Sequence, residues 1–420
     1  MSPVRLVTRL GQRFGGLPGD FYRLWSGNAI SSLGDGTTTA AAPLLVASIT
    51  TDPRLVAGAA AMNQIPYLVL SLPAGVLVDR FDKRHICMAA DAVRTVSTAV
   101  LAVLIATGHI SIPVLYVLLA VEGIASIADR NAGQTLIPAL VGPDQIPRAN
   151  ARLQGSAMLC AFLIGPPLGA ALFLATHWTP FAVDAASFVL SLAAYSRIRW
   201  REPGRVRAPA RVWTEARAGL VWLWRHRALR TLAVCICVMN LTFGGVMAVL
   251  VVYAHRQLHS GAAGYGALLT ATALGGLVGS AIAGPLERRF GMTPLLRVGL
   301  TIESLTHVGL ALSHALVAAY VVLLAFGVHA VLWNVVTSSL QQRVTPAGLR
   351  GRTNGAYTLF SVGGHAVGAV LGGVFVHLWG ITSPMWISAV VVGLLVLLAW
   401  RPFALTDADR AGGGGPAAAT

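Results

Sequence analysis

Long apolar stretches recur along the whole chain, separated by short segments that hold most of the charged residues. Each stretch is roughly 20 residues long, which is the length that an α-helix needs to cross a bilayer. Apolar and polar residues do not alternate within them, as they would in the strands of a membrane β-barrel. The pattern predicts twelve transmembrane helices, at 24–50, 56–78, 86–107, 111–137, 150–173, 179–197, 229–254, 262–286, 292–313, 316–340, 354–376 and 381–400.

Composition agrees with this pattern. Of the 420 residues, 55% are hydrophobic and 11% are charged, whereas soluble domains contain about 25% charged residues. The chain is therefore expected to be an all-α membrane protein.

The basic residues are distributed unevenly between alternate loops. This asymmetry follows the positive-inside rule, and it predicts a multi-pass protein of the cell (inner) membrane with both termini in the cytoplasm. It also accounts for the net charge of +15 without a nucleic-acid partner. The predicted outer loops hold little more than Arg54 and Arg256. The predicted inner segments hold Arg5, Arg9, Arg13, Arg80, Lys83, Arg84, Arg148, the cluster from Arg197 to Arg230, Arg288, Arg289, Arg343, Arg350, Arg352 and Arg401.

One long loop, rich in Pro and Arg, divides the predicted helices six and six. Its later part, 212–224, suits an amphipathic helix on the inner surface, and a plain basic linker is the alternative. Residues 1–19 suit a short interfacial helix, and the Gly- and Ala-rich end suits a disordered tail. The predicted divisions are 1–20, a cytoplasmic segment; 21–198, the first six-helix bundle; 199–227, the linker; 228–403, the second bundle; and 404–420, the tail.

Two landmarks repeat in the two halves. The second predicted helix ends in an acid–Arg pair, Asp79-Arg80, and the eighth ends in Glu287-Arg288, about half the chain later. The fifth helix contains Gly165-Pro-Pro-Leu-Gly169 and the eleventh contains Gly364-His-Ala-Val-Gly368. Paired halves are typical of secondary transporters that bind their substrate between the halves. The sequence thus predicts two pseudo-symmetric six-helix bundles.

The stretch GVLVDRFDKR resembles the loop motif of the major facilitator superfamily between helices two and three. The resemblance implies the twelve-helix fold of that superfamily and a latch that stabilises its outward-facing state. It also implies that Asp79 meets the start of helix eleven, near Gly351 and Arg352. A loop that merely obeys the charge rule is the alternative. The latch residues would be Gly75, Asp79, Arg80, Lys83 and Arg84.

The fifth helix resembles the antiporter motif of drug–proton exchangers in the same superfamily. Gly165, Pro166 and Gly169 match that motif, while Ala161 and Ala170 replace its outer glycines. Small residues permit close helix contact and proline bends a helix. The resemblance implies export, with generic helix packing as the alternative.

Other short segments resemble those of the superfamily branch that holds macrolide-efflux proteins and the enterobactin exporter. Two of them are Leu24-Trp-Ser-Gly-Asn28 and Phe181-Ala-Val-Asp184. Charged Asp129-Arg130 and His365 depart from the usual pattern of that branch, which leaves the substrate open.

Ionisable groups inside the predicted helices are costly at bilayer depth, so each needs a role or a partner. Asp35 lies in a polar first helix and is the first candidate for reversible protonation, with Glu122 as the second. Asp129 and Arg130 are further candidates, or are solvated near the inner surface. Two local pairs are also expected, Asp91 with Arg94 at i and i+3 and Glu303 with His307 one turn apart.

Polar stripes on the first, tenth and eleventh helices suit the wall of a substrate cavity that is otherwise apolar. They contain Asn28, Ser31, Asn334, Thr337, Tyr357, Ser361 and His365.

No nucleotide-binding loop, zinc-protease motif or nucleophile elbow occurs, so neither ATP hydrolysis nor another enzymatic activity is expected. No metal or cofactor is predicted. We expect a monomer whose partners are a small molecule, protons and the lipid bilayer. The favoured hypothesis is proton-coupled export of a hydrophobic or amphiphilic compound. An uptake porter for a nutrient or siderophore is the alternative, followed by a non-transporting membrane sensor.

Overall fold

The computed structural model describes residues 16–200, 212–346 and 349–400, with side chains at 63, 69, 71–80, 212–213 and 215–216 left out. The described residues form helices joined by short loops and contain no strand. Eight helical stretches within them are long and apolar enough to cross a membrane. The all-helical membrane prediction is therefore confirmed, while the count of twelve spans stays a prediction.

The described residues fall into two compact units. The first extends to Thr51 and resumes at Met62–Val212, and the second combines Asp52–Ala61 with the chain from Trp213 onward. The predicted divisions at 198/199 and 227/228 stay predictions.

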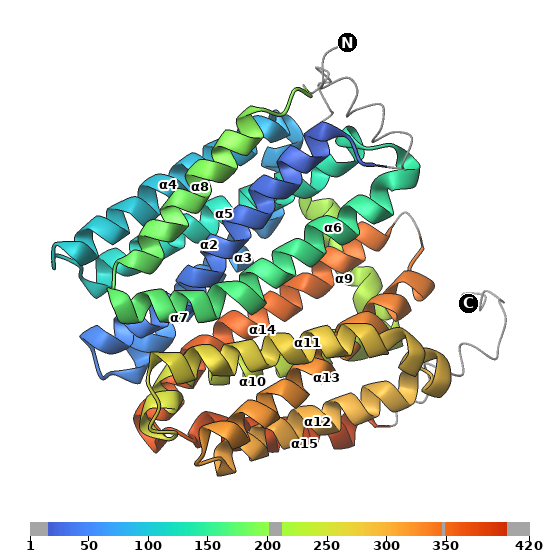
Figure 1. The fold of residues 1–420 in the computed structure, drawn as a ribbon. Coiled ribbons are helices and arrows are strands. Elements are labelled where there is room, and N and C mark those ends of the chain that lie inside the picture. Colours follow the sequence, from blue (N-terminus) through green and yellow to red (C-terminus); the bar gives the residue numbers. More distant parts are fainter. Residues whose placement is uncertain (1–15, 201–211, 347–348, 401–420) are drawn as a thin grey trace, which may run out of the picture. The chain divides into compact units, whose positions relative to one another are not determined.

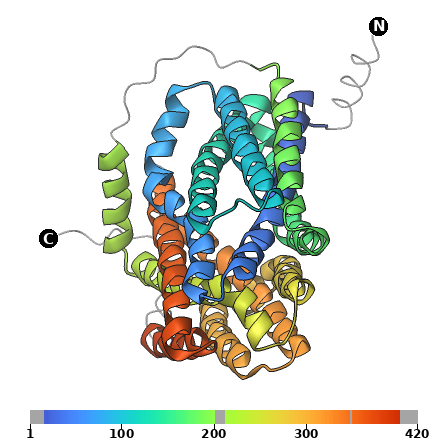
Figure 2. The same cartoon turned by 90° about the vertical axis from the view of Figure 1, so that its left-hand side faces the viewer.

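The first unit is a bundle whose helices, blue to green in Figures 1 and 2, run alongside one another. Its helices pack closely because glycines face their neighbours. Gly27 lies against the ring of Tyr195, where an added Cβ would be 2.6 Å from Cε1. Gly34 leaves room for Asp184 and Ser187 in the same way. The helical segments are α2 (Gly19–Ile49), the part of α3 (Pro53–Arg80) that follows Ala61, α4 (Lys83–Ala106), α5 (Ile112–Leu140), η1 (Pro143–Gln145), α6 (Ile146–Met158), η2 (Leu159–Ile164), α7 (Gly165–Ala175) and α8 (Thr179–Ser196).

The fifth predicted helix is not one regular α-helix. It begins near Ile146 instead of at 150, and a π-helical segment, η2, separates α6 from α7. Pro166 and Pro167 stand at the start of α7 and lack the N–H groups that would bond to the preceding turn. A local widening of the helix fits these missing donors.

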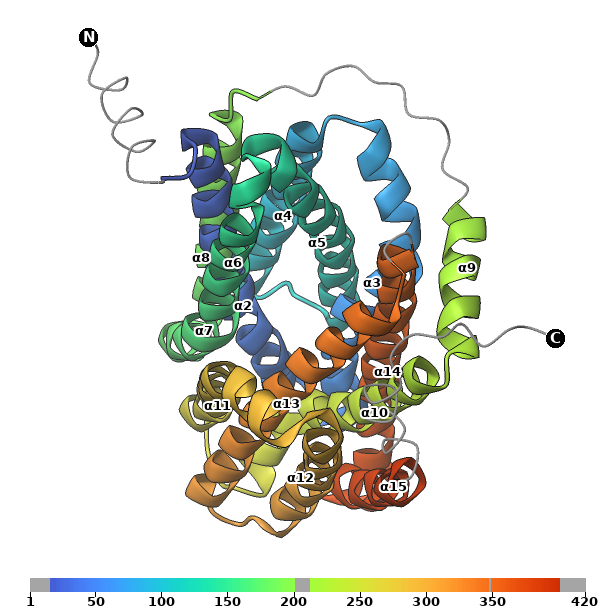
Figure 3. The ribbon, with the colours of Figure 1, turned by 90° about the vertical axis from the view of Figure 1, so that its right-hand side faces the viewer.

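The second unit contains α9 to α15, and the views in Figures 1 and 3 agree that α12 lies beside α15. The helix α9 covers the stretch in which the sequence allowed an amphipathic helix. The helices are α9 (Val212–Arg225), α10 (Arg227–Arg256), α11 (Ala262–Phe290), α12 (Met292–Leu312), α13 (Leu316–Val344), α14 (Arg350–Trp379) and α15 (Ser383–Ala399).

The repeated glycine landmarks occupy equivalent places in the two units. In the first unit, Gly165 and Gly169 of α7 lie against the backbone of α2 at Gly36 and Thr37. In the second unit, Gly364 and Gly368 of α14 lie against the backbone of α10 at Cys237 and Leu241. The fifth helix of the first half and the eleventh helix thus each pack onto the first helix of their own half. This matches the internal similarity that the sequence predicts.

The predictions for residues 1–15 and 401–420 fall outside the described residues, as does most of the linker before α9.

Candidate proton-binding site

Arg94 lies at the centre of a buried polar cluster in the first unit. Its side chain points inward from α4 and is 2% exposed, and its Nη2 donates to the Asp35 carboxylate from α2. The same nitrogen lies 3.3 Å from Glu122 Oε1, which α5 supplies. Asp91, one turn before Arg94 on α4, places Oδ1 3.9 Å from Nη1. One guanidinium therefore contacts three carboxylates from three helices.

The surroundings of this cluster are both apolar and acidic. The Phe188 ring of α8 covers the guanidinium, with its centroid 3.9 Å from Cζ of Arg94. Asp184 of α8 is fully buried and accepts a 2.6 Å hydrogen bond from Thr38 on α2. Asp129 is buried two turns beyond Glu122 on α5. These further acids lie within the same bundle as Arg94.

Charge balance sets what the cluster can do. A single guanidinium neutralises one carboxylate, so three ionised acids around Arg94 leave a negative surplus in an apolar interior. Such a surplus is costly, and binding protons to carboxylates removes it. Asp35 is the most accessible of the three, because 31% of its side chain is exposed, against 8% for Glu122 and none for Asp91. The geometry therefore suits reversible proton binding, with Asp35 as the point of entry.

The structure brings together Asp35 and Glu122, the two first candidates from the sequence. Asp129 is buried nearby, whereas Arg130 is exposed. Arg94 is the residue of this cluster whose partners on other helices the sequence did not predict. The expected local pair of Arg94 with Asp91 exists only as the longest of its three ion-pair contacts.

The predicted latch is only partly described. The side chains of Gly75, Asp79 and Arg80 lie outside the described residues. Lys83 is buried at the start of α4. Arg84 donates to the backbone oxygens of Tyr195 and Ser196 at the end of α8.

The candidates for a substrate cavity take up varied positions. On α2, Ser31 is buried and donates to the Asn28 carbonyl at 3.2 Å. On α14, Ser361 accepts from Asn240 of α10 at 3.2 Å.

Three further candidates lie in the second unit. On α13, Thr337 is buried and donates to its own helix, while Asn334 is exposed. The ring of His365 lies 6.4 Å from that of Phe243. Tyr357 is also buried. Their role in binding a substrate stays a prediction.

A second buried cluster surrounds Glu303 of α12. Its Oε2 lies 3.0 Å from Nε2 of His329 on α13, and its Oε1 lies 3.7 Å from Nε2 of His307. The sequence predicted the contact with His307 but missed His329, which is distant in the chain and lies outside the polar stripe of its helix. Within the described residues no cluster of acidic, His or Cys side chains is placed to hold a metal ion.

Comparisons with known proteins cover nearly the whole chain. A family model described as transmembrane secretion effector matches residues 18–412. The multidrug efflux pump Tap of Mycobacterium tuberculosis is 28% identical over 398 residues, which cover 91% of this chain and 93% of that protein. The enterobactin exporter EntS of Salmonella paratyphi A is 26% identical over 337 residues, which cover 77% of this chain and 78% of that protein.

Solved transporter structures share the fold at low sequence identity. A bacterial homologue of the iron transporter ferroportin in its inward-facing state superposes with a TM-score of 0.71 at 19% identity, over 92% of this chain and 98% of that one. A point mutant of the nucleoside transporter NupG gives a TM-score of 0.76 at 9% identity, over 92% of this chain and all of that one.

Proposed function

Because the chain belongs to the transmembrane secretion effector family of the major facilitator superfamily, we propose that it exports a hydrophobic or amphiphilic small molecule in exchange for protons. Two relatives that match most of its length are named a multidrug efflux pump and an enterobactin exporter, which supports outward transport. An antibiotic, a secondary metabolite or a siderophore is the substrate class that these names favour.

The Arg94 cluster is the observation that carries the proton-exchange part of this proposal. Asp35, Glu122 and Asp91 share one guanidinium, so the protonation of one carboxylate changes which of the others Arg94 binds. Because these groups come from α2, α4 and α5, a proton alters the contacts between three helices. A charge-sharing cluster of this kind can link proton binding to a conformational change.

In the proposed cycle, the substrate binds from the cytoplasm or inner leaflet while Asp35 is ionised and paired with Arg94. Exposure of the site to the outside lets a proton reach Asp35, which weakens its hold on Arg94 and accompanies substrate release. Arg94 then binds Glu122 and Asp91 until the proton leaves to the cytoplasm. The proton motive force drives this direction, at about 2.3 kcal/mol per charge for each 100 mV.

We also propose the finer architecture that this cycle uses. Two six-helix bundles, at 21–198 and 228–403, would alternate between inward and outward access, with both termini in the cytoplasm. The motif from Gly75 to Arg84 would act as the latch of the outward-facing state. Close packing of Gly165 and Gly169 on α2 supports a tight seam next to the proton site.

The proposal is tested by efflux from cells that produce the protein, over a panel of antibiotics, with and without a protonophore. We expect extrusion that stops on addition of the protonophore and in Asp35→Asn. The matched control is Asp144→Asn, which neutralises an exposed acid in η1 and should leave extrusion unchanged. Size-exclusion chromatography of both variants establishes that they fold. Extrusion that persists with the protonophore, or substrate accumulation instead of loss, contradicts the proposal.

A further inference from the structure

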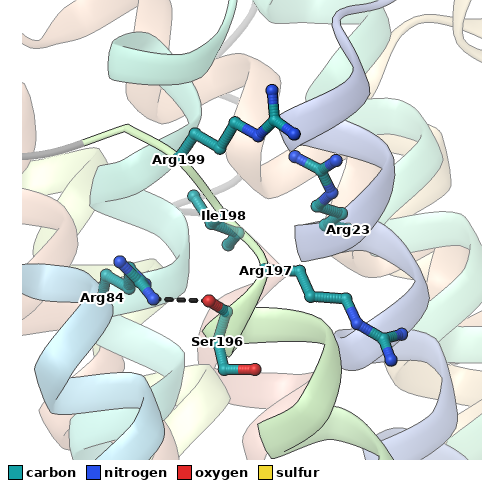
Figure 4. A pocket seen from close by; sticks show the side chains of 6 residues that line it. All are labelled: Arg23, Arg84, Ser196, Arg197, Ile198 and Arg199. Atoms are coloured by element: carbon teal, nitrogen blue, oxygen red, sulfur yellow. Dashed lines mark hydrogen bonds between the residues drawn. The ribbon is translucent and has the colours of Figure 1, made fainter. Parts of the chain in front are cut away.

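A second feature of the first unit is a pocket lined by four arginines. Its volume is about 540 Å³, and Arg23, Arg84, Ser196, Arg197, Ile198 and Arg199 line it. Figure 4 shows that these residues come from α2, from α4 and from the end of α8 with the loop that follows. In this view the guanidinium groups of Arg23 and Arg199 are turned toward one another. Cations gathered in this way repel one another unless an anion lies among them.

Asp20 fixes one side of the pocket. One oxygen of its carboxylate pairs with Arg23, and the other accepts the backbone N–H groups of Arg199 and Trp200, each at 3.1 Å. The loop after α8 is therefore held against the start of α2. The loop binds this Asp20 oxygen through backbone N–H groups and not through the side chain of Arg199. The Arg199 guanidinium is therefore available to the pocket.

Arg84 fixes the opposite side. It donates to the carbonyl oxygens of Tyr195 and Ser196 at the C-terminal end of α8, where the Tyr195 oxygen also accepts the backbone N–H of Ile198. Arg197 and Arg199 are exposed, and no described carboxylate pairs with their guanidinium groups. Arg84 thus joins α4 to the end of α8 and Arg23 pairs with Asp20, whereas the guanidinium groups of Arg197 and Arg199 retain their donors for a ligand.

Tryptophans indicate the depth of this pocket in the membrane. Trp25 and Trp200 pack on the apolar cluster at the same end of the bundle, beside Leu24 and Ile198. Tryptophan collects at the level of lipid headgroups, where its ring meets hydrocarbon and its N–H meets water. Trp25 donates its N–H to the Arg152 carbonyl at 3.3 Å, so its ring is fixed at this end of the bundle. We therefore expect the pocket to lie near the headgroup level, where phosphate groups are abundant.

We propose that this arginine pocket binds a phosphate group, presented either by the headgroup of an anionic phospholipid or as free phosphate. The planar guanidinium matches phosphate oxygens in a two-point geometry and remains charged at all physiological pH values. The proposal concerns a site apart from the Arg94 cluster, and it does not depend on the transported substrate.

The test is a titration of the full-length protein in neutral detergent, followed by intrinsic tryptophan fluorescence. The probes are dioctanoyl phosphatidylglycerol, dioctanoyl phosphatidylcholine and sodium phosphate. We expect saturable binding that weakens at least roughly tenfold in Arg197→Ala/Arg199→Ala, since each lost charge-assisted hydrogen bond lowers affinity by about that factor. The matched control is Arg288→Ala/Arg289→Ala, which removes two exposed cations from the end of α11.

The three probes separate the two sources of phosphate. Binding of phosphatidylglycerol in preference to the other two probes assigns the site to an anionic lipid, and binding of sodium phosphate alone assigns it to the free ion. Arg197→Gln/Arg199→Gln repeats the measurement if the alanine variant does not fold. The proposal is overturned if no probe binds, or if the pocket and control variants lose affinity equally.

Discussion

Arg94 on α4 binds the carboxylate of Asp35 on α2, although 59 residues separate the two in the sequence. The bond crosses the interior of the first bundle, where the Arg94 side chain is almost completely enclosed. It joins the polar first helix to α4, which also buries Asp91 one turn before Arg94. The proton-binding proposal depends on that single guanidinium, and we expect the stability of this bundle to depend on it as well.

Arg94→Ala is expected to destabilise the protein strongly, because it leaves three acids without their shared cation. Removal of one partner from a buried ion pair costs about 3–5 kcal/mol. The midpoint of thermal unfolding in detergent measures the loss. Arg130→Ala, which removes an exposed cation from the adjacent α5, serves as the control and should change the midpoint little. Equal midpoints for Arg94→Ala and the parent protein would sink this prediction.

Gly169→Ala is expected to loosen the seam between α7 and α2. Its Cβ would overlap the carbonyl oxygen of Thr37, and neither backbone can move aside without disturbing its helix. Overpacking of this kind typically costs about 1–3 kcal/mol. Gly155→Ala on α6 is the control, because nothing lies within 4 Å of its added Cβ. That control should gain roughly 0.5–1 kcal/mol from helix propensity. Similar unfolding midpoints for the two variants would contradict the packing argument.

Much of the helical architecture could be predicted from the sequence, since apolar runs of membrane-spanning length are a strong local signal. The glycines at 165, 169, 364 and 368 also revealed their packing role, because they repeat in both halves. The π-helical segment before Pro166 was missed. Its formation depends on how the helix adjusts to the two backbone N–H groups that Pro166 and Pro167 lack. The spacing of residues in the sequence does not reveal that adjustment.

The sequence predicted two of the acidic residues of the candidate site, but it did not predict which residues they contact. Asp35 and Glu122 stand out because they are charges within apolar runs. Arg94 was paired with Asp91, since a sequence reveals neighbours at i+3 and conceals those on other helices. His329 was missed for the same reason, because its partner Glu303 lies 26 residues earlier on another helix.

His329→Ala is expected to destabilise the second unit more than His307→Ala. His329 makes the closer contact with Glu303, at 3.0 Å, whereas His307 lies 3.7 Å away. Loss of a hydrogen bond to a charged group costs about 1.5–3 kcal/mol. Thermal unfolding of the two variants and of the His329→Ala/Glu303→Gln double variant provides the measurement. In the double variant part of the loss should be recovered, because no buried carboxylate is left without its partner. A larger loss in His307→Ala would show that the shorter contact is not the stronger one.

The last prediction concerns pH and the loop between α2 and α3. The Arg54 side chain donates to both oxygens of Asp52, with its Nη2 at 2.7 Å from Oδ2, and this bonding lowers the pKa of Asp52 below its ordinary value. A lowered pKa in the folded state means that the folded protein holds the proton less tightly than the unfolded chain. The stability that the pair contributes is therefore complete above about pH 4–5 and declines as the pH falls through the lowered pKa.

Asp52→Asn is accordingly expected to lower the unfolding midpoint by a small amount between about pH 5 and pH 8, and in a His377→Ala background that amount should stay constant over this range. The difference should shrink at lower pH, because the parent protein then loses the charge that the variant lacks throughout. His377 lies 3.9 Å from Asp52 and adds a second favourable charge when it is protonated, so His377→Ala separates its part from that of Arg54. A difference that grows as the pH falls below about 5 would reverse the sign and refute the assignment of the lowered pKa to this pair.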